Sequence, residues 1–177
     1  MKIKFNHVQD LADARYASAA LADWIGFAID GPHAISLQNI QEIIGWCNGP
    51  KVIIEIYDSA NIDKIQAWLN VIPVDGIECD SKYFEDLKAQ FPLMPEWIVR
   101  LSDANNLQKM DPEIIAHTNK AFDIQNQLIL NISDEIHGFS SDDFSFYGFS
   151  LDCIKEIETG KKDFSEWNSL FEKIEIY

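Results

Sequence analysis

Short runs rich in isoleucine, valine and aromatic residues alternate with helical patterns along most of this chain. Their composition and length are typical of β-strands. We predict eight strands, at Lys2–Asn6, Trp24–Ile29, Lys51–Tyr57, Val74–Cys79, Glu96–Leu101, Glu113–His117, Gln127–Ile132 and Ser145–Leu151. Between the early runs and after the last one, apolar residues recur every three or four positions, which is the helical period. These helical stretches are Leu11–Ala22, Ser36–Cys47, Asn61–Ile72, Ser81–Phe91 and Asp163–Ile174.

The alternation of strand and helix predicts parallel strands joined by right-handed crossovers. Eight such strands favour an α/β fold closed into a (β/α)8 TIM barrel. The alternative is a doubly wound sheet, which normally carries a glycine-rich turn after its first strand, but Asn6–Asp10 contains no glycine. A chain of 177 residues suits one domain, so we assign 1–177 to a single compact barrel. Little chain remains for helices within 120–127 and 133–144, so we expect shortened or missing helices in the second half.

The composition limits the partners that the chain can have. Its formal net charge of −15 disfavours nucleic acid and anionic membranes, because both require a basic surface. No apolar run approaches the roughly 20 residues that span a bilayer. The opening MKIKF leads directly into the folded pattern rather than into a signal peptide, so we expect a cytoplasmic location. Cys47, Cys79 and Cys153 are odd in number and lack CxxC spacing, which argues against a disulfide framework or a zinc knuckle.

Several segments resemble phosphoribosylanthranilate isomerase, the barrel enzyme of tryptophan biosynthesis. The opening KFNHVQDLADARYASAALADWIGFAI keeps the spacing of that family's first strand, helix and second strand, with matches at Lys4, Asp13, Ala14, Asp23, Gly26 and Phe27. Further similar segments are HAISLQNIQEII, VDGIECDS and the GKKD of Gly160–Asp163. The resemblance spans most of the chain and is firmest at its two ends. It implies a TIM barrel with an isomerase ancestry.

At the positions that are catalytic in the family, this chain has different residues. The family's general-base cysteine aligns with Asn6, and the glycine that follows it aligns with His7. An amide has no proton to exchange near neutral pH and cannot act as a general base. The family's general-acid aspartate falls near His117, and its substrate-binding arginine falls near His33. The proton relay that the resemblance implies is therefore incomplete.

The phosphate-binding turns of the family are also missing. The resemblance places glycine-rich turns after the seventh and eighth strands, where backbone N–H groups would hold a phosphate. The matching stretches here are NISDEIHG and SLDCIKEIETG, which carry Asp134, Glu135 and Asp152. Like charges in a partly buried site repel a dianion by several kcal/mol. We therefore expect that a phosphorylated substrate does not bind.

Alternation along the strands predicts which side chains face the barrel interior. If Asn6 points inward, the same register turns Lys4, Glu55, Glu78 and Arg100 inward, and with them Tyr57, Asp80, Ser102 and His117. One interpretation is a closed ion-pair network, because buried charges persist only when they are paired. The other is a polar, acid-leaning ligand pocket at the carboxyl-terminal face. We predict the network for the layer of Lys4, Glu55, Glu78 and Arg100, and a solvated cleft for Asn6, Asp80, His117 and Asp152.

The remaining aromatic and histidine residues receive structural interpretations. Apolar patterns predict that all five tryptophans lie in the core or pack between the helices and the barrel. They are Trp24, Trp46, Trp68, Trp97 and Trp167. His7 and His137 are expected to be surface or capping residues. A metal site of His33, His117 and Asp30 is a weak alternative because no spacing motif supports it, so we expect no metal and no cofactor.

Three functions are compatible with these observations. The first is a relative of phosphoribosylanthranilate isomerase that lacks the activity and either binds another small molecule or has a regulatory role. The second is a true isomerase with an atypical site built on His117 and a carboxylate. The third is a different enzyme on the same barrel. The third would use Asp80, His117 or Asp152 on an unphosphorylated or cationic substrate. A fold does not decide among them. The family catalytic positions are Asn6 and His117, and the candidate binding residues are His33, Asp80, Arg100 and Asp152; the sequence makes no prediction about oligomeric state.

Overall fold

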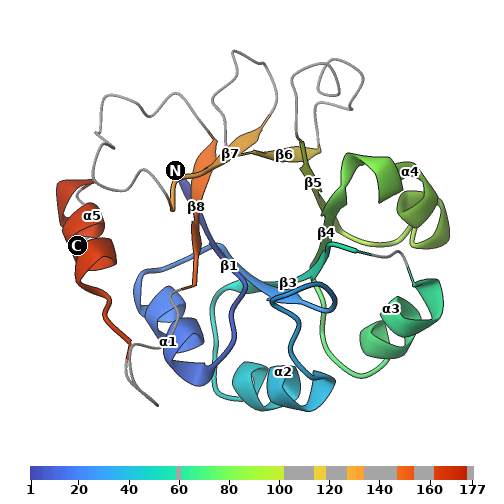
Figure 1. Ribbon diagram of the computed structural model, residues 1–177, viewed down its shortest axis with the longest axis horizontal. Helices are drawn as coiled ribbons and strands as arrows, with labels where there is room; N and C mark the ends of the chain where they lie inside the picture. Colours follow the sequence, from blue (N-terminus) through green and yellow to red (C-terminus); the bar gives the residue numbers. More distant parts are fainter. Residues whose placement is uncertain (59–60, 102–113, 119–126, 134–146, 154–161, 175–177) are drawn as a thin grey trace.

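Eight parallel strands close into a barrel in the computed structural model of the chain, as Figure 1 shows in a view down the barrel. The structure describes residues 1–58, 61–101, 114–118, 127–133, 147–153 and 162–174. Neighbours in the sequence are neighbours in the barrel, and β1 also pairs with β8. The strands are β1 (Lys2–Asn6), β2 (Trp24–Ala28), β3 (Lys51–Ile56), β4 (Gly76–Asp80), β5 (Glu96–Arg100), β6 (Ile115–Thr118), β7 (Leu128–Asn131) and β8 (Gly148–Asp152). The predicted TIM barrel is confirmed.

Five helices are present in the described part of the chain, fewer than the eight of a complete TIM barrel. They are α1 (Leu11–Ala19), α2 (Leu37–Ile44), α3 (Ile62–Leu69), α4 (Ser81–Gln90) and α5 (Ser165–Lys173). The side chains of Asp10, Ser36 and Asn61 accept hydrogen bonds from backbone N–H groups in the first turns of α1, α2 and α3, which is why these helices begin where they do. Almost all of 120–127 and 133–144, where we expected turns or loops, lies outside the described residues.

The helices pack on the outer face of the barrel and bury its outward-facing side chains. Trp68, Trp97 and Trp167 are buried in this layer, as predicted. Trp24 is also buried, as predicted, but in the core inside the barrel, where it closes the amino-terminal end together with Ile53, Ile98, Ile115 and Ile129. No helix of the described residues is long and apolar enough to cross a membrane.

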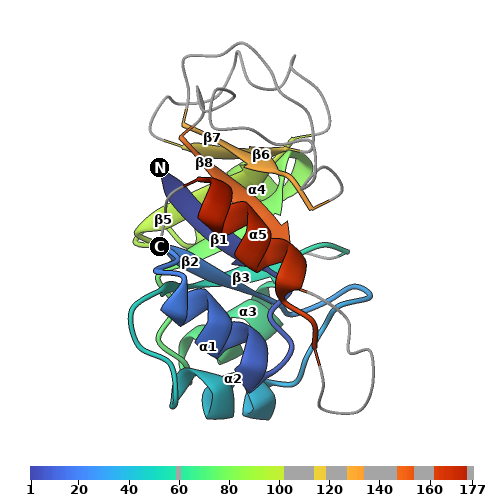
Figure 2. The ribbon, with the colours of Figure 1, turned by 90° about the vertical axis from the view of Figure 1, so that its left-hand side faces the viewer.

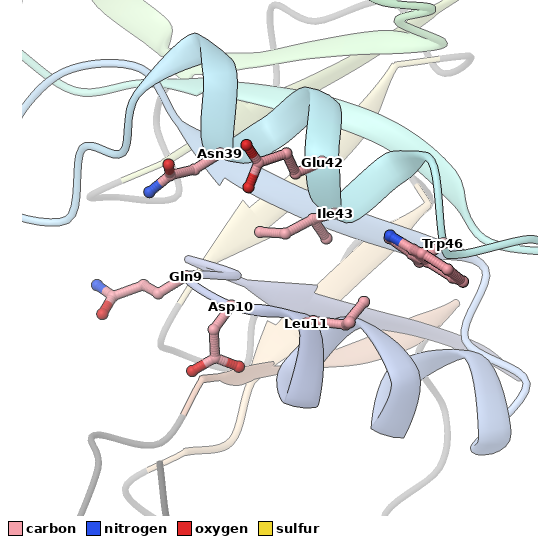
Figure 3. A pocket seen from close by; sticks show the side chains of 7 residues that line it. All are labelled: Gln9, Asp10, Leu11, Asn39, Glu42, Ile43 and Trp46. Atoms are coloured by element: carbon pink, nitrogen blue, oxygen red, sulfur yellow. The ribbon is translucent and has the colours of Figure 1, made fainter. Parts of the chain in front are cut away.

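The prediction for Trp46 is wrong, because 70% of this side chain is exposed. The last residue of α2 is Ile44, so Trp46 lies past the helix and no longer on its buried stripe. Figure 3 shows Trp46 at one end of a groove between α2 and the start of α1. The groove has a volume of about 310 Å³, an apolar side formed by Leu11, Ile43 and Trp46, and a polar side. It lies outside the barrel rather than over the ends of the strands.

The two ends of the chain, where the family resemblance is firmest, are joined by a buried ion pair. Lys162 Nζ lies 2.6 Å from Asp13 Oδ2 and 2.8 Å from Asp10 Oδ2, and the Lys162 and Asp13 side chains are almost completely buried. Figure 2 shows α5 packed beside α1 on the same side of the barrel. Asp23 has a similar role, because its carboxylate accepts hydrogen bonds from the Ile3 backbone N–H and from Lys2 Nζ. Asp13 and Asp23, shared with the family pattern, thus have structural roles here.

Candidate functional site

A network of charged and polar side chains fills the middle of the barrel. Strand alternation turns Lys4, Glu55, Glu78, His117 and Ser150 inward from five different strands. Four of them are completely buried, and His117 is 5% exposed. This layer sits above the apolar layer that closes the amino-terminal end of the barrel.

Lys4 is the centre of the network. Its Nζ lies 2.5 Å from Glu55 Oε1 and 2.7 Å from Glu78 Oε2, and it donates a hydrogen bond of 2.5 Å to Asn6 Oδ1. Burial opposes the charge of Lys4, but the two carboxylates outweigh it and raise its pKa. Burial likewise opposes the charge of Glu55, yet Lys4 and the hydrogen bond with His7 together lower its pKa to about 2. The predicted ion-pair network is confirmed for Lys4, Glu55 and Glu78.

Gly26 is required for this network to fit. A Cβ atom at position 26 would overlap the Glu55 carboxylate and would lie 2.8 Å from Lys4 Nζ. The absence of a side chain on β2 therefore leaves the space that the ion pair occupies. This explains in physical terms why the glycine appears among the positions shared with the family pattern.

Asn6 and His117 belong to the same buried network and meet at one hydroxyl group. His117 Nδ1 lies 2.6 Å from Glu78 Oε1, and its Nε2 lies 2.8 Å from Ser150 Oγ. Asn6 Nδ2 donates to the same Ser150 Oγ at 3.1 Å. The two side chains are 1% and 5% exposed, so our prediction that they line a solvated cleft is wrong. The structure does bring the two family catalytic positions together.

The amide of Asn6 has all of its hydrogen-bonding groups engaged. Its Nδ2 donates to Ser150 Oγ and, at 2.8 Å, to Asp152 Oδ1, while its Oδ1 accepts from Lys4. These contacts tie β1 to β8 across the register that pairs Asn6 with Asp152. Asn6 is therefore a connecting residue of the network.

Arg100 joins this network to the barrel mouth, by which we mean the carboxyl-terminal end of the strands. Its Nη1 lies 3.1 Å from Glu78 Oε1, its Nε lies 3.1 Å from Asp80 Oδ1, and its Nη2 donates to the Ile56 carbonyl. The guanidinium also lies over the Tyr57 ring, 3.9 Å from its centroid. Asp80 keeps about a third of its side chain exposed. The predicted contact of Arg100 with Glu78 is confirmed, and Asp80 lies at the solvent-facing edge of the network.

Asp152 lies at the end of β8, one residue beyond the strand that we predicted. Its carboxylate accepts hydrogen bonds from Asn6 and, at 3.0 Å, from Asn131, and its backbone N–H donates to Ser133 Oγ at 2.6 Å. The side chain is 39% exposed. The structure therefore fixes a partly exposed carboxylate at the mouth, next to the substituted position Asn6. Asp134 and Glu135 lie outside the described residues.

His7 is the mouth residue that the sequence did not identify. Its Nδ1 lies 3.1 Å from both Glu55 Oε2 and the Tyr57 hydroxyl, and its ring stacks on His33 with centroids 4.4 Å apart. Burial opposes protonation of His7, but the hydrogen bond with Glu55 and the nearby Asp152 raise its pKa. Only 14% of the side chain is exposed, so the expected surface or capping role is wrong. The available signal was its alignment with a glycine of the family pattern.

His33 lies at the mouth, where its ring stacks on His7. The Asp30 carboxylate accepts a hydrogen bond of 2.6 Å from the backbone N–H of Tyr57. Within the described ranges, no group of three or more His, Cys, Asp or Glu side chains is arranged to hold a metal ion.

Comparison with solved structures identifies the fold. A phosphoribosylanthranilate isomerase in complex with a reduced deoxyribulose 5-phosphate compound superposes with a TM-score of 0.77 and 14% identity, covering 99% of this chain and 98% of that one. A monomeric form generated from the dimeric isomerase of Thermotoga maritima gives a TM-score of 0.75 and 13% identity over the same shares of the chains. The chain has the fold of phosphoribosylanthranilate isomerase.

Other enzymes share this architecture. A truncated 3-deoxy-D-arabino-heptulosonate 7-phosphate synthase from Thermotoga maritima gives a TM-score of 0.69 and 10% identity, covering 99% of this chain and 85% of that one. No family model and no curated protein matches the sequence. Since enzymes with different reactions share the fold, the function has to be argued from the site.

Proposed function

We propose that the chain is a phosphoribosylanthranilate isomerase-like barrel protein without isomerase activity, whose mouth binds a small unphosphorylated molecule. The observation that carries this proposal is the amide of Asn6, at the position where the family resemblance places a general base. All of its hydrogen-bonding groups are engaged by Lys4, Ser150 and Asp152. An amide in this state cannot take a proton from a substrate carbon.

The charges at the mouth support the exclusion of phosphorylated ligands. Asp152 and Asp80 are partly exposed carboxylates at the mouth. Asp80 is paired with Arg100, whereas Asp152 lies 3.6 Å from His7 Nε2, beyond direct hydrogen-bond distance. A phosphate dianion beside Asp152 would be repelled by several kcal/mol at an intermediate dielectric. A cytoplasmic location, no cofactor, and no nucleic-acid or membrane partner complete the proposal.

The test is conversion of phosphoribosylanthranilate by the purified protein, followed through the loss of anthranilate fluorescence, with the Thermotoga maritima isomerase as positive control. We expect no conversion above the uncatalysed rate, and no rescue of a tryptophan auxotroph that lacks its isomerase. Rescue at ordinary expression would overturn the proposal.

A genuine isomerase with an atypical site is the second candidate. The observation that favours it is the pair of His7, whose pKa is raised, and Asp152 at the mouth, which together offer a proton donor and a proton acceptor. Rescue that is lost in both His7→Gly and Asp152→Asn, and kept in Asn6→Ala, would establish this candidate.

A further inference from the structure

The backbone of His7 adopts a conformation that is unfavourable for residues other than glycine. Its φ angle is 55°, and Leu21, with φ of 54°, is the other non-glycine residue with a positive φ in the described part of the chain. Leu21 follows Ala20, the C-cap residue of α1, at a position where left-handed residues are common. His7 instead follows the last residue of β1, at the mouth. A strained residue with a functional side chain in such a place points to a role in ligand binding.

The contacts of His7 fix the direction of its imidazole ring. The backbone N–H and Nδ1 of His7 both contact Glu55 Oε2, at 3.2 and 3.1 Å. The Tyr57 hydroxyl lies 3.1 Å from the same Nδ1, and His33 stacks on the ring. These contacts leave Nε2 as the ring nitrogen that faces Asp152. Among the described residues, Nε2 has no hydrogen-bond partner.

The separation between Nε2 and the Asp152 carboxylate suits a bridging atom. At 3.6 Å it is too long for a direct hydrogen bond, but one oxygen atom can lie within hydrogen-bond distance of both groups. Burial and the charge of Lys4 lower the pKa of His7, whereas the hydrogen bond to Glu55 and the charges of Glu55 and Asp152 raise it. The raising contributions are larger, so the pKa of His7 is raised and the ring stays protonated to higher pH. The protonated ring then donates Nδ1–H toward Glu55 and retains Nε2–H as a donor.

We propose that His7 Nε2 and the Asp152 carboxylate together bind a hydroxyl group of a neutral polyhydroxylated ligand. The hydroxyl oxygen accepts from His7 and donates its hydrogen to Asp152. A phosphate satisfies His7 but repels Asp152, and an amine satisfies Asp152 but offers no acceptor to His7. This inference rests on the proposed function, since it names the ligand class of the same mouth.

The experiment uses protein with ¹⁵N-labelled histidine, titrated separately with D-ribose, inorganic phosphate and ethylamine. We expect D-ribose to shift the Nε2 resonance of His7 in a saturable manner, and the other two probes to leave it unchanged. His7→Gly should weaken D-ribose binding at least ~10-fold, and Asp152→Asn should also weaken it. Because a raised pKa keeps the imidazole charged, affinity should fall as the pH rises above 6.5 through that pKa.

The controls separate binding from folding. Glycine accepts the backbone conformation of residue 7, so His7→Gly should keep the circular dichroism spectrum of the wild type. Leu21→Gly makes the same backbone change away from the mouth and should bind D-ribose like the wild type. If D-ribose raises the melting temperature without moving the His7 resonance, this inference is wrong and the proposed function stands. If phosphate moves that resonance, both are wrong, and if no probe moves it, this inference is wrong.

Discussion

Replacement of Lys4 by methionine removes the central cation of the barrel while keeping a side chain of similar length. Lys4 Nζ contacts Glu55, Glu78 and Asn6, all of which are almost completely buried. Glu55 and Glu78 are register partners on the adjacent strands β3 and β4. Without Lys4, these two carboxylates remain buried side by side with less compensating charge. We therefore expect Lys4→Met to destabilise the protein strongly.

The magnitude follows from the partners that remain. Removing one member of a buried ion pair typically costs about 3–5 kcal/mol. Glu55 would keep His7, and Glu78 would keep His117 and Arg100, so part of the charge compensation survives. Methionine fills most of the vacated volume, so the added cavity cost is small. We expect a loss of about 3 kcal/mol, toward the lower end of that range.

Urea denaturation followed by tryptophan fluorescence measures this loss, and Lys2→Met is the matched control. Lys2 lies on the same strand, but its side chain is 43% exposed and pairs with Asp23 at the surface, so Lys2→Met should cost about 1 kcal/mol or less. The comparison should be repeated at pH 5. Lys4 and His7 hold the pKa of buried Glu55 at about 2, so the contribution of this carboxylate is present above its ordinary pKa of 4.5 and is lost as the pH falls toward 2.

In Lys4→Met, burial should raise the pKa values of the two carboxylates, because the charge that lowered them has been removed. They then bind protons at pH 5, and the difference in unfolding free energy between wild type and variant should be smaller there than at pH 7. A Lys4→Met curve within about 1 kcal/mol of the wild type at pH 7 would refute the network as a source of stability. A difference that grows at pH 5 would refute the assignment of the cost to unpaired carboxylates.

Two further substitutions test other parts of the network by the same denaturation assay. Arg100→Met should cost about 2 kcal/mol, because its hydrogen bonds and its stacking on Tyr57 are lost. This is less than the cost of losing Lys4, because Glu78 keeps two other partners, and a denaturation curve that overlays the wild type would contradict it. Gly26→Ala should cost about 1–3 kcal/mol, because the added methyl group overlaps the Glu55 carboxylate, and an unchanged midpoint would show that the barrel accommodates it.

The sequence was sufficient to predict the barrel and the main ion pairs because both depend on periodicity. The alternation of strand and helix restricts the topology to parallel strands, and the two-residue period of a strand determines which side chains face inward. Once Asn6 is placed inside, Lys4 must also lie inside, and the same reasoning applies to Glu55 and Glu78 on their strands. The contacts among Lys4, Glu55 and Glu78 follow this period directly.

Depth along the barrel axis could not be predicted in this way. The stagger between neighbouring strands sets the level of each side chain, and the period of a single strand contains no information about stagger. Lys4 is level with Ser150, so His117 reaches Ser150 inside the network instead of lying in a cleft with Asp80. The exposure of Trp46 has a local cause, because the helix ends before the periodic pattern of apolar residues does.

The position of Asn6 explains why, on our proposal, ligand binding at the mouth depends on His7, the next residue, rather than on Asn6. Asn6 connects Lys4 to Ser150 and Asp152. A cysteine there would provide neither the amide oxygen that accepts from Lys4 nor the two N–H groups that donate to Ser150 and Asp152. A cysteine at this position would therefore remove three hydrogen bonds, two of them buried, before it could serve as a base. His7 projects from the same strand end and has a partly exposed ring, and its Nε2 makes no direct hydrogen bond to a described residue. A change of function is thus easier at His7, where the barrel loses less of its internal network.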